Sequence, residues 1–135
     1  MPLVGSYLLE TQIVMDAAYR VHTRLGPGLL ESAYEACLAY EIRKRGLELK
    51  CQVPLPLVYD DVRLDAGYRI DLLVEGKIIV EVKTIKAIDR IHCAQLLSYL
   101  RLTGCVEGML FNFNSVRLKD GYRRILNDRP ASTTH

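Results

Sequence analysis

Hydrophobic side chains repeat at the spacing of an α-helix in three parts of the chain. Between residues 8 and 25 apolar residues recur every fourth position, which predicts a helix that the glycines and proline at 26–28 bring to an end. A second helix is expected over residues 29–45 and a third over 88–103. Each of these two is followed by a glycine, a residue that is common just past a helix C-terminus.

The segments between and after these helices have the character of β-strands. Residues 49–58 are rich in strand-forming residues, and two prolines within them favour an edge strand or an extended arm. Further strands are expected near 62–64, as a hairpin over 69–83, at 108–112 and at 122–126. The order of helix, helix, strands, helix and strands predicts an α/β sandwich around a mixed sheet.

The length and composition are those of one globular domain. The chain has 135 residues, half of them hydrophobic and a quarter charged, which is typical of a folded domain rather than a disordered chain. We expect a single domain over residues 1–127 and a disordered tail over 128–135. No apolar run approaches the length of a membrane span and no signal peptide is recognisable, so a cytoplasmic protein without a membrane partner is expected.

The hairpin over residues 69–83 carries charge inside apolar strands. Strand side chains alternate between the two faces of a sheet. If residues 75–77 form the loop, one face collects six apolar residues, namely Ile70, Leu72, Val74, Ile78, Val80 and Val82. The other face then brings Asp71 next to Glu81, with Lys83 beside them. A two-residue turn would place the two carboxylates on opposite faces, so the longer loop or an equivalent bulge fits the pattern better.

Charged groups in such strands are unfavourable unless something compensates them. Two adjacent carboxylates repel each other, and the pKa of one of them is raised unless a cation is bound. Because only oxygen ligands are at hand, Asp71 and Glu81 suit Mg²⁺ or Mn²⁺ better than zinc. Lys83 lies on the same face, where its ammonium group can orient a water or stabilise charge on a phosphate.

Three short motifs follow one another along the chain. Residues 28–34 match the pattern G-x-x-E-x-x-Y, Asp71 is followed by Glu81-x-Lys83, and residues 95–99 read Q-x-x-x-Y. The second motif resembles the active-site signature of the PD-(D/E)XK, or restriction-endonuclease-like, nuclease superfamily. The first resembles the motif that names the GxxExxY family of small bacterial and archaeal proteins in this superfamily, and the third resembles an element of its exonuclease-like branch.

The resemblance extends from about residue 8 to residue 127, with one departure. The proline that precedes the first aspartate in the superfamily is replaced by Ile70. The resemblance implies a restriction-endonuclease-like α/β sandwich, in which helices flank a central mixed sheet and the active site lies at one edge of the sheet.

The resemblance also implies the roles of a metal-dependent nuclease. Asp71, Glu81 and the backbone carbonyl of Val82 would hold one Mg²⁺ or Mn²⁺ ion, and Glu31 would complete the metal site directly or through water. Lys83 would assist the attacking hydroxide. Without the motif, Glu31 would be read as a residue that the helix dipole favours at a helix start.

Four further residues are candidates for contact with the substrate. Gln95 on a half-buried stripe needs a polar partner, which a substrate phosphate or the region of Lys83 can provide. Tyr34 either hydrogen-bonds to Glu31 or packs in the core, and core packing also accounts for Tyr99. Arg90 is one of several basic residues that can contact phosphates.

The expected partner is nucleic acid, with DNA placed before RNA. The net charge of +2 does not by itself indicate nucleic-acid binding. One alternative is a non-catalytic nucleic-acid-binding or accessory protein with the same fold, and another is a homo-oligomer that associates through an edge strand at residues 53–58. The carboxylates at Asp71 and Glu81 favour the nuclease, because clustered carboxylates repel phosphate and have no use in binding alone.

Overall fold

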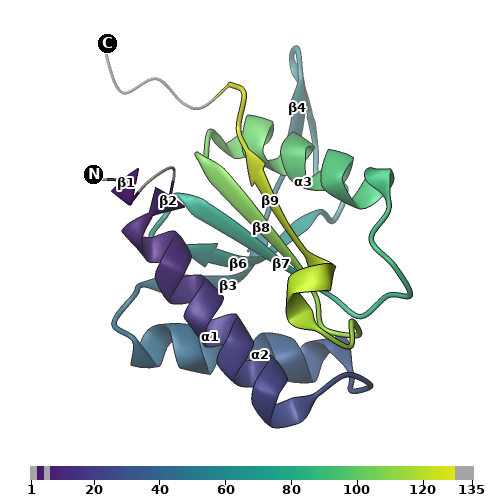
Figure 1. Ribbon diagram of the computed structural model, residues 1–135. Helices are drawn as coiled ribbons and strands as arrows, with labels where there is room; N and C mark the ends of the chain where they lie inside the picture. The colour runs from purple at the N-terminus through teal and green to yellow at the C-terminus, as the bar shows by residue number, and fades with distance from the viewer. Residues whose placement is uncertain (1–2, 5–6, 130–135) are drawn as a thin grey trace.

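The computed structural model describes residues 3–4 and 7–129, and it shows three layers (Figure 1). Helices α1 (Leu9–Leu25) and α2 (Glu31–Lys44) cover one face of a five-stranded sheet, and α3 (Arg90–Thr103) covers the other. All three helices lie where the sequence pattern predicts them. The fold is the predicted α/β sandwich with a mixed central sheet.

The sheet places a hairpin at its centre. Its strand order is β3 (Leu49–Pro54), β6 (Arg69–Val74), β7 (Ile78–Lys83), β8 (Glu107–Asn112) and β9 (Tyr122–Leu126). Only β7 and β8 pair in parallel, because α3 forms the crossover connection between them. β3 is an edge strand of this sheet, as its prolines predict.

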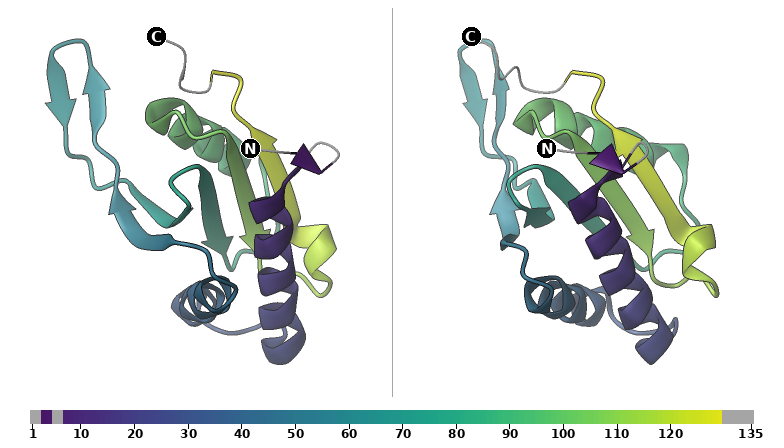
Figure 2. Two further views of the ribbon diagram at one scale, coloured as in Figure 1. Left: turned by 90° about the vertical axis from the view of Figure 1, so that its left-hand side faces the viewer. Right: turned by 60° about the vertical axis from the view of Figure 1, so that its left-hand side comes forward.

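A small two-stranded arm projects from the body (Figure 2). It consists of β4 (Leu57–Tyr59) and β5 (Val62–Leu64), which pair with each other and form a separate sheet. A further short pair, β1 (Leu3–Val4) and β2 (Tyr7–Leu8), precedes α1, and a 3₁₀ turn (Leu118–Gly121) precedes β9.

Each face of the sheet has its own hydrophobic core. The core under α1 and α2 contains Leu72, Val74, Ile78, Val80 and Val82. These are five of the six residues predicted to share a face of the hairpin. The prediction is wrong for Ile70, which packs in the α3 core instead. The strict alternation of faces ends at the next residue of β6, because β6 and β7 separate there.

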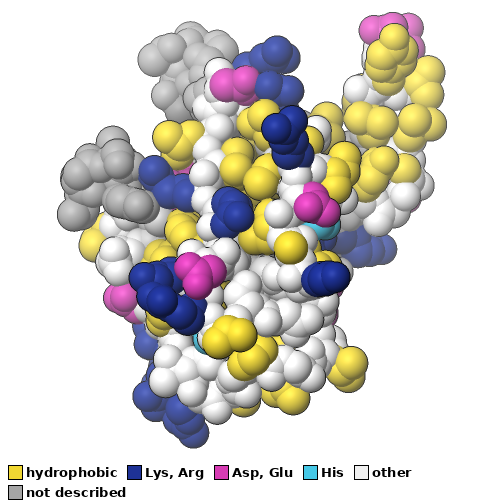
Figure 3. Space-filling view, turned by 45° about the vertical axis from the view of Figure 1, so that its right-hand side comes forward, with side chains coloured by type: hydrophobic (Ala, Val, Ile, Leu, Met, Phe, Trp, Pro, Cys, Tyr) yellow, Lys and Arg dark blue, Asp and Glu magenta, His cyan; other side chains and the backbone are white. Residues whose placement is uncertain are grey.

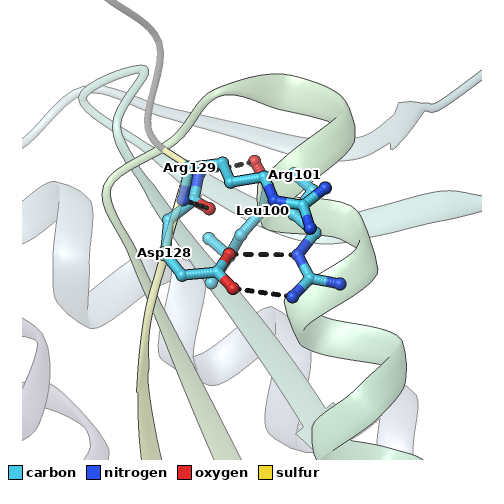
Figure 4. A network of polar contacts seen from close by, with 5 residues as sticks. Leu100, Arg101, Asp128 and Arg129 are labelled. Atoms are coloured by element: carbon cyan, nitrogen blue, oxygen red, sulfur yellow. Dashed lines mark hydrogen bonds and ion pairs between the residues drawn. The ribbon is translucent and has the colours of Figure 1, made fainter.

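Hydrogen bonds join the segment after β9 to α3 and to the turn that follows α3. The Asn127 side chain donates hydrogen bonds to the carbonyl oxygens of Leu100 at 2.9 Å and Cys105 at 2.7 Å. The next residue, Asp128, forms a two-point ion pair with Arg101 (Figure 4). The predicted disordered tail over 128–135 thus begins with an ordered contact, and residues 130–135 lie outside the described residues. No helix in residues 3–4 and 7–129 has the length and apolarity to cross a membrane.

Candidate active site

The backbone pairing of the central hairpin ends where its two carboxylates begin. β6 and β7 pair as far as Leu72 and Val80. Beyond this pair, side-chain oxygens take the place of backbone acceptors. The Asp71 N–H donates to Glu81 Oε2 over 3.0 Å, and the Val82 N–H donates to Asp71 Oδ2 over 2.8 Å. The two carboxylates therefore meet, as predicted, in the fork where the strands separate, and we call this place the β6–β7 fork.

Burial changes the acidity of both carboxyl groups. Glu81 is only 5% exposed, and burial together with the negative charge of Asp71 raises its pKa to about 8. Burial also raises the pKa of Asp71, against the opposing effects of the Val82 hydrogen bond and the Lys83 charge. The Lys83 ammonium group acts on both carboxyl groups, but it does not offset their burial. The β6–β7 fork thus has a deficit of positive charge.

A glutamine joins the β6–β7 fork to α2. The side-chain amide of Gln52 in β3 lies 3.0 Å from each carboxylate oxygen of Glu35, to which it donates, and 3.4 Å from Asp71 Oδ1. The backbone of Gln52 has φ 52°, a left-handed conformation that is uncommon for a residue other than glycine. Strain of this kind clusters at functional sites. Burial raises the pKa of Glu35, and the charges of Asp71 and Glu31 add to the shift.

The structure brings Glu35 rather than Glu31 toward the two strand carboxylates. Glu31 is exposed at the first residue of α2, and its charge contributes to raising the pKa of Glu35. The charge of Glu35 in turn contributes to raising the pKa of Glu81. Contact between Glu31 and a metal, directly or through water, stays a prediction.

Tyr34 forms hydrogen bonds to the backbone of the loop that precedes α2. Its side chain is fully buried, and its ring stacks on Phe113 with centroids 4.7 Å apart. The hydroxyl donates to the Gly26 carbonyl and accepts from the Leu29 N–H. Gly28 in the same loop has φ 102°, which favours glycine. Of the two roles left open for Tyr34, the structure shows the core packing, and contact of this side chain with a substrate stays a prediction.

The candidates on α3 divide between two surfaces. Gln95 and Tyr99 line one groove. Burial of Tyr99, together with the charges of Glu81 and Asp71, raises its phenolic pKa, so its ring lies within electrostatic reach of the β6–β7 fork. Arg90 is exposed at the start of α3 and lines a different hollow.

Sequence reasoning missed three residues that shape the site. Glu35 lies four positions after Glu31 and therefore on the same helix face, a signal that could have identified it. Gln52 gives no such signal, because its role depends on its backbone conformation. The buried Asn112 holds the segment after β7 through two hydrogen bonds to the backbone of Ile85, at 3.0 and 2.9 Å.

The ligand atoms at the β6–β7 fork fit a hard divalent cation. Asp71 and Glu81 offer carboxylate oxygens, and burial raises the pKa of both in spite of the nearby charge of Lys83. Within residues 3–4 and 7–129, no group of three or more His, Cys, Asp and Glu side chains is arranged to hold a metal ion. Mg²⁺ commonly retains several waters and binds through one or two protein carboxylates together with substrate phosphates, so two carboxylates suffice for this metal.

Comparison with models of protein families identifies the family of the chain. A family model described as the PD-(D/E)XK nuclease superfamily matches residues 9–125, a span that contains all three helices and the β6–β7 fork. The chain belongs to the PD-(D/E)XK nuclease superfamily. Its mixed five-stranded sheet flanked by helices has the restriction-endonuclease-like fold of this superfamily, and the assignment of Asp71, Glu81 and Lys83 to the active-site signature stays a prediction. The narrower assignment to the GxxExxY family stays a prediction. No curated protein and no solved structure matches the chain.

Proposed function

We propose that this PD-(D/E)XK protein is a metal-dependent phosphodiesterase that hydrolyses nucleic acid, with DNA as the expected substrate. The observation that carries the proposal is the meeting of Asp71 and Glu81 in the β6–β7 fork. Burial and mutual repulsion make this arrangement unfavourable in the absence of a cation. The superfamily to which the chain belongs supports a nuclease-type activity.

Each group at the β6–β7 fork has a role in this proposal. Asp71, Glu81 and the Val82 carbonyl would hold Mg²⁺ or Mn²⁺, which supplies charge neutralisation at the scissile phosphate and lowers the pKa of a bound water. The backbone N–H groups of Asp71 and Val82 fix the orientation of the two carboxylates. Lys83 stabilises negative charge on the phosphate and the attacking oxygen.

Gln52 and Glu35 support these groups from the side of α2. The Gln52 amide holds Asp71 Oδ1 and the Glu35 carboxylate together, and this contact limits the rotation of Asp71. Residues that orient a metal-binding carboxylate affect the metal almost as strongly as the carboxylate itself. We therefore assign Gln52 a positioning role, and we assign Glu35 a place beside the attacking water.

A cleavage assay with Lys83→Ala tests the proposal. Purified wild type is incubated with Mg²⁺ or Mn²⁺ and with single-stranded, paired, gapped and branched DNA and the corresponding RNAs. Cleavage by Lys83→Ala should fall by about two orders of magnitude or more, while the melting temperature and the Mg²⁺ affinity stay close to those of wild type. Lys50→Ala removes an exposed lysine from β3 and is the matched control, which should cleave like wild type.

Two results would contradict the proposal. One is equal cleavage by wild type and Lys83→Ala, which would assign the activity to another site or to a contaminant. The other is an absence of divalent-ion binding in calorimetry even when nucleic acid is present, which would favour the non-catalytic accessory protein.

A further inference from the structure

A groove runs between α3 and the base of the β4–β5 arm. It is lined by Leu57, Tyr68, Ile91, His92, Gln95, Ser98, Tyr99 and Leu102 and has a volume of about 530 Å³. This volume falls in the usual range of small-molecule binding sites, about 300–1,000 Å³. Hydrophobic side chains continue onto the arm, which ends in acidic side chains (Figure 3). We call this hollow the α3 groove.

The walls of the α3 groove expose apolar surface that a folded protein normally buries. Ile91 is 70% exposed, Leu102 is 43% exposed and Tyr68 is 42% exposed. Gathered in one groove, such side chains indicate a place where a ligand or a partner binds. The apolar walls therefore call for an occupant that has apolar faces.

Tyr99 places the α3 groove near the β6–β7 fork. The rings of Tyr68 and Tyr99 meet edge to face, with centroids 6.2 Å apart and planes at 63°. Tyr99 lies within the electrostatic reach of Glu81 and Asp71, as its raised pKa shows. A ligand that stacks on Tyr68 would thus lie close to Tyr99 and, through Tyr99, near the β6–β7 fork.

A few polar groups accompany the apolar walls. His92 Nδ1 accepts a 2.8 Å hydrogen bond from the Asp89 N–H, which leaves its Nε2–H to donate to a ligand. The Gln95 amide both donates and accepts, and Ser98 is exposed with a free choice of hydroxyl direction. Apolar faces combined with hydrogen-bonding edges are the chemistry of a nucleobase.

We propose that the α3 groove binds an unpaired nucleobase next to the scissile phosphate, so that the substrate is nucleic acid with a single-stranded segment at the cleavage position. A base inside a duplex is covered on both faces by its neighbours and paired along its edge. Only a base outside the stack can lie on an aromatic ring and offer that edge to side chains. This inference rests on the proposed function and names its substrate class.

The test measures the coupling between Tyr68 and the base that it contacts. Two DNA ligands are used, a duplex with a short gap and the same gapped duplex with an abasic residue in the gap. Binding is followed by fluorescence anisotropy in Mg²⁺, in a Lys83→Ala background so that the DNA stays intact. The variants are Tyr68→Ala and its matched control Tyr59→Ala, which truncates a 70% exposed tyrosine of β4 outside the groove.

The expected result is a double-mutant cycle that is not additive. Tyr68→Ala should weaken binding to the gapped duplex about tenfold, the usual effect of losing one base–aromatic stack. Removal of the base should weaken binding to a similar extent. Both changes together should be no worse than either one alone, and Tyr59→Ala should leave binding unchanged. Since Tyr68 is an exposed side chain, the variant is expected to melt at the wild-type temperature.

Additive effects, or equal effects of Tyr68→Ala and Tyr59→Ala, would overturn the inference. If Tyr68→Ala melts early, Ile91→Ala is measured in its place, with Val116→Ala as the control for another exposed apolar residue. A groove covered by a second copy of the chain would also overturn the inference. In that case Ile91→Asp would convert a dimer to a monomer in sedimentation and leave DNA affinity unchanged.

Cleavage by the wild-type chain separates this inference from the proposed function. Equal cleavage of paired and gapped duplexes, with no coupling between Tyr68 and the base, would support the proposed nuclease activity and contradict base binding in the α3 groove. Non-additive binding without cleavage of any ligand would support base binding in the α3 groove and contradict the proposed nuclease activity. Cleavage at the gap that depends on Tyr68 supports both.

Discussion

At the scale of single residues, the most informative feature is the acidity of Glu81. Its side chain is buried next to another carboxylate, and its pKa is raised to about 8. In an unfolded chain an ordinary glutamate ionises near pH 4.5. Between these two values the folded protein retains a proton that the unfolded chain has lost, so the state of Glu81 links folding to pH.

The first prediction concerns the stability of the metal-free protein. Because the folded pKa of Glu81 is raised, its contribution to stability is full below about pH 4.5 and is lost as the pH rises through about 8. Glu81→Gln remains neutral, so in EDTA it should melt several degrees above wild type at pH 8.5, with a smaller difference at pH 5.5. Melting curves across this pH range test the prediction.

An exposed glutamate provides the control. Glu48→Gln removes a carboxylate at a surface position and should follow the pH dependence of wild type. If Glu81→Gln lost stability with rising pH as steeply as wild type, the pKa of Glu81 would not be raised and the β6–β7 fork would not lack positive charge.

A second prediction separates backbone strain from positioning at Gln52. Glycine accepts φ 52° without a steric penalty, so Gln52→Gly removes strain that costs about 1 kcal/mol. It also removes the amide that holds Asp71 and Glu35 together. We expect stability near or slightly above wild type, with cleavage and Mg²⁺ affinity lowered about tenfold or more.

Asp60→Gly is the matched control, because Asp60 has the same φ of 52° in the turn of the arm. It should gain stability without loss of cleavage or metal affinity. If Gln52→Gly kept full metal affinity and activity, Gln52 would have a structural role only.

At the scale of elements, the sequence predicts the features that depend on the regular spacing of apolar residues. It does not predict the features that depend on a local interruption of strand pairing. The helices, the central hairpin and the strand at 122–126 follow from the spacing of apolar residues. The departure at Ile70 could not be predicted, because it lies next to the point where the Asp71 backbone pairs with the Glu81 side chain instead of with a backbone carbonyl, and such a local break leaves no periodic signal.

The same limit applies to the candidate site. The sequence brings Asp71 and Glu81 together through β alternation, and in the structure the two are joined through backbone hydrogen bonds at the point where that alternation ends. The roles of Asp71, Glu81 and Lys83 stay predictions. The sequence points to Glu31 through a motif, whereas Glu35, one turn further along the same helix face, is the residue that Gln52 joins to Asp71. A pattern along one helix does not define which of its turns lies next to a given strand, so the sequence could not choose between Glu31 and Glu35.

A third prediction concerns the connection between β9 and α3. Asn127 is buried and donates to two carbonyls, and its removal leaves both without this partner. Asn127→Ala should therefore destabilise the protein by about 1–3 kcal/mol, as measured by urea unfolding. Asp128→Ala breaks only an exposed ion pair with Arg101 and should have a much smaller effect, which salt reduces further. Equal destabilisation by the two substitutions would contradict this account.

At the scale of the whole molecule, the candidate active-site residues lie where three structural units meet. α2 supplies Glu35, the sheet supplies Gln52, Asp71, Glu81 and Lys83, and α3 supplies the groove on the other side. The arm contributes one wall of that groove and otherwise stands apart from the body (Figure 2). A substrate bound in the groove would therefore contact Leu57 at the base of the arm and α3 at the same time.

The β6–β7 fork has a consequence for the choice of inactive variants. Asp71 and Glu81 take the places of backbone partners between two central strands, so each of them connects the strands in addition to the catalytic role that we propose for it. Truncation of Asp71 to alanine would leave the Val82 N–H without its acceptor and would loosen the pairing of β6 with β7. In Asp71→Ala, a loss of activity caused by the missing carboxylate therefore cannot be separated from a loss caused by disruption of the sheet. The Lys83 side chain makes no such connection between β6 and β7. Substitution of Lys83 is therefore the better way to obtain an inactive protein that stays folded.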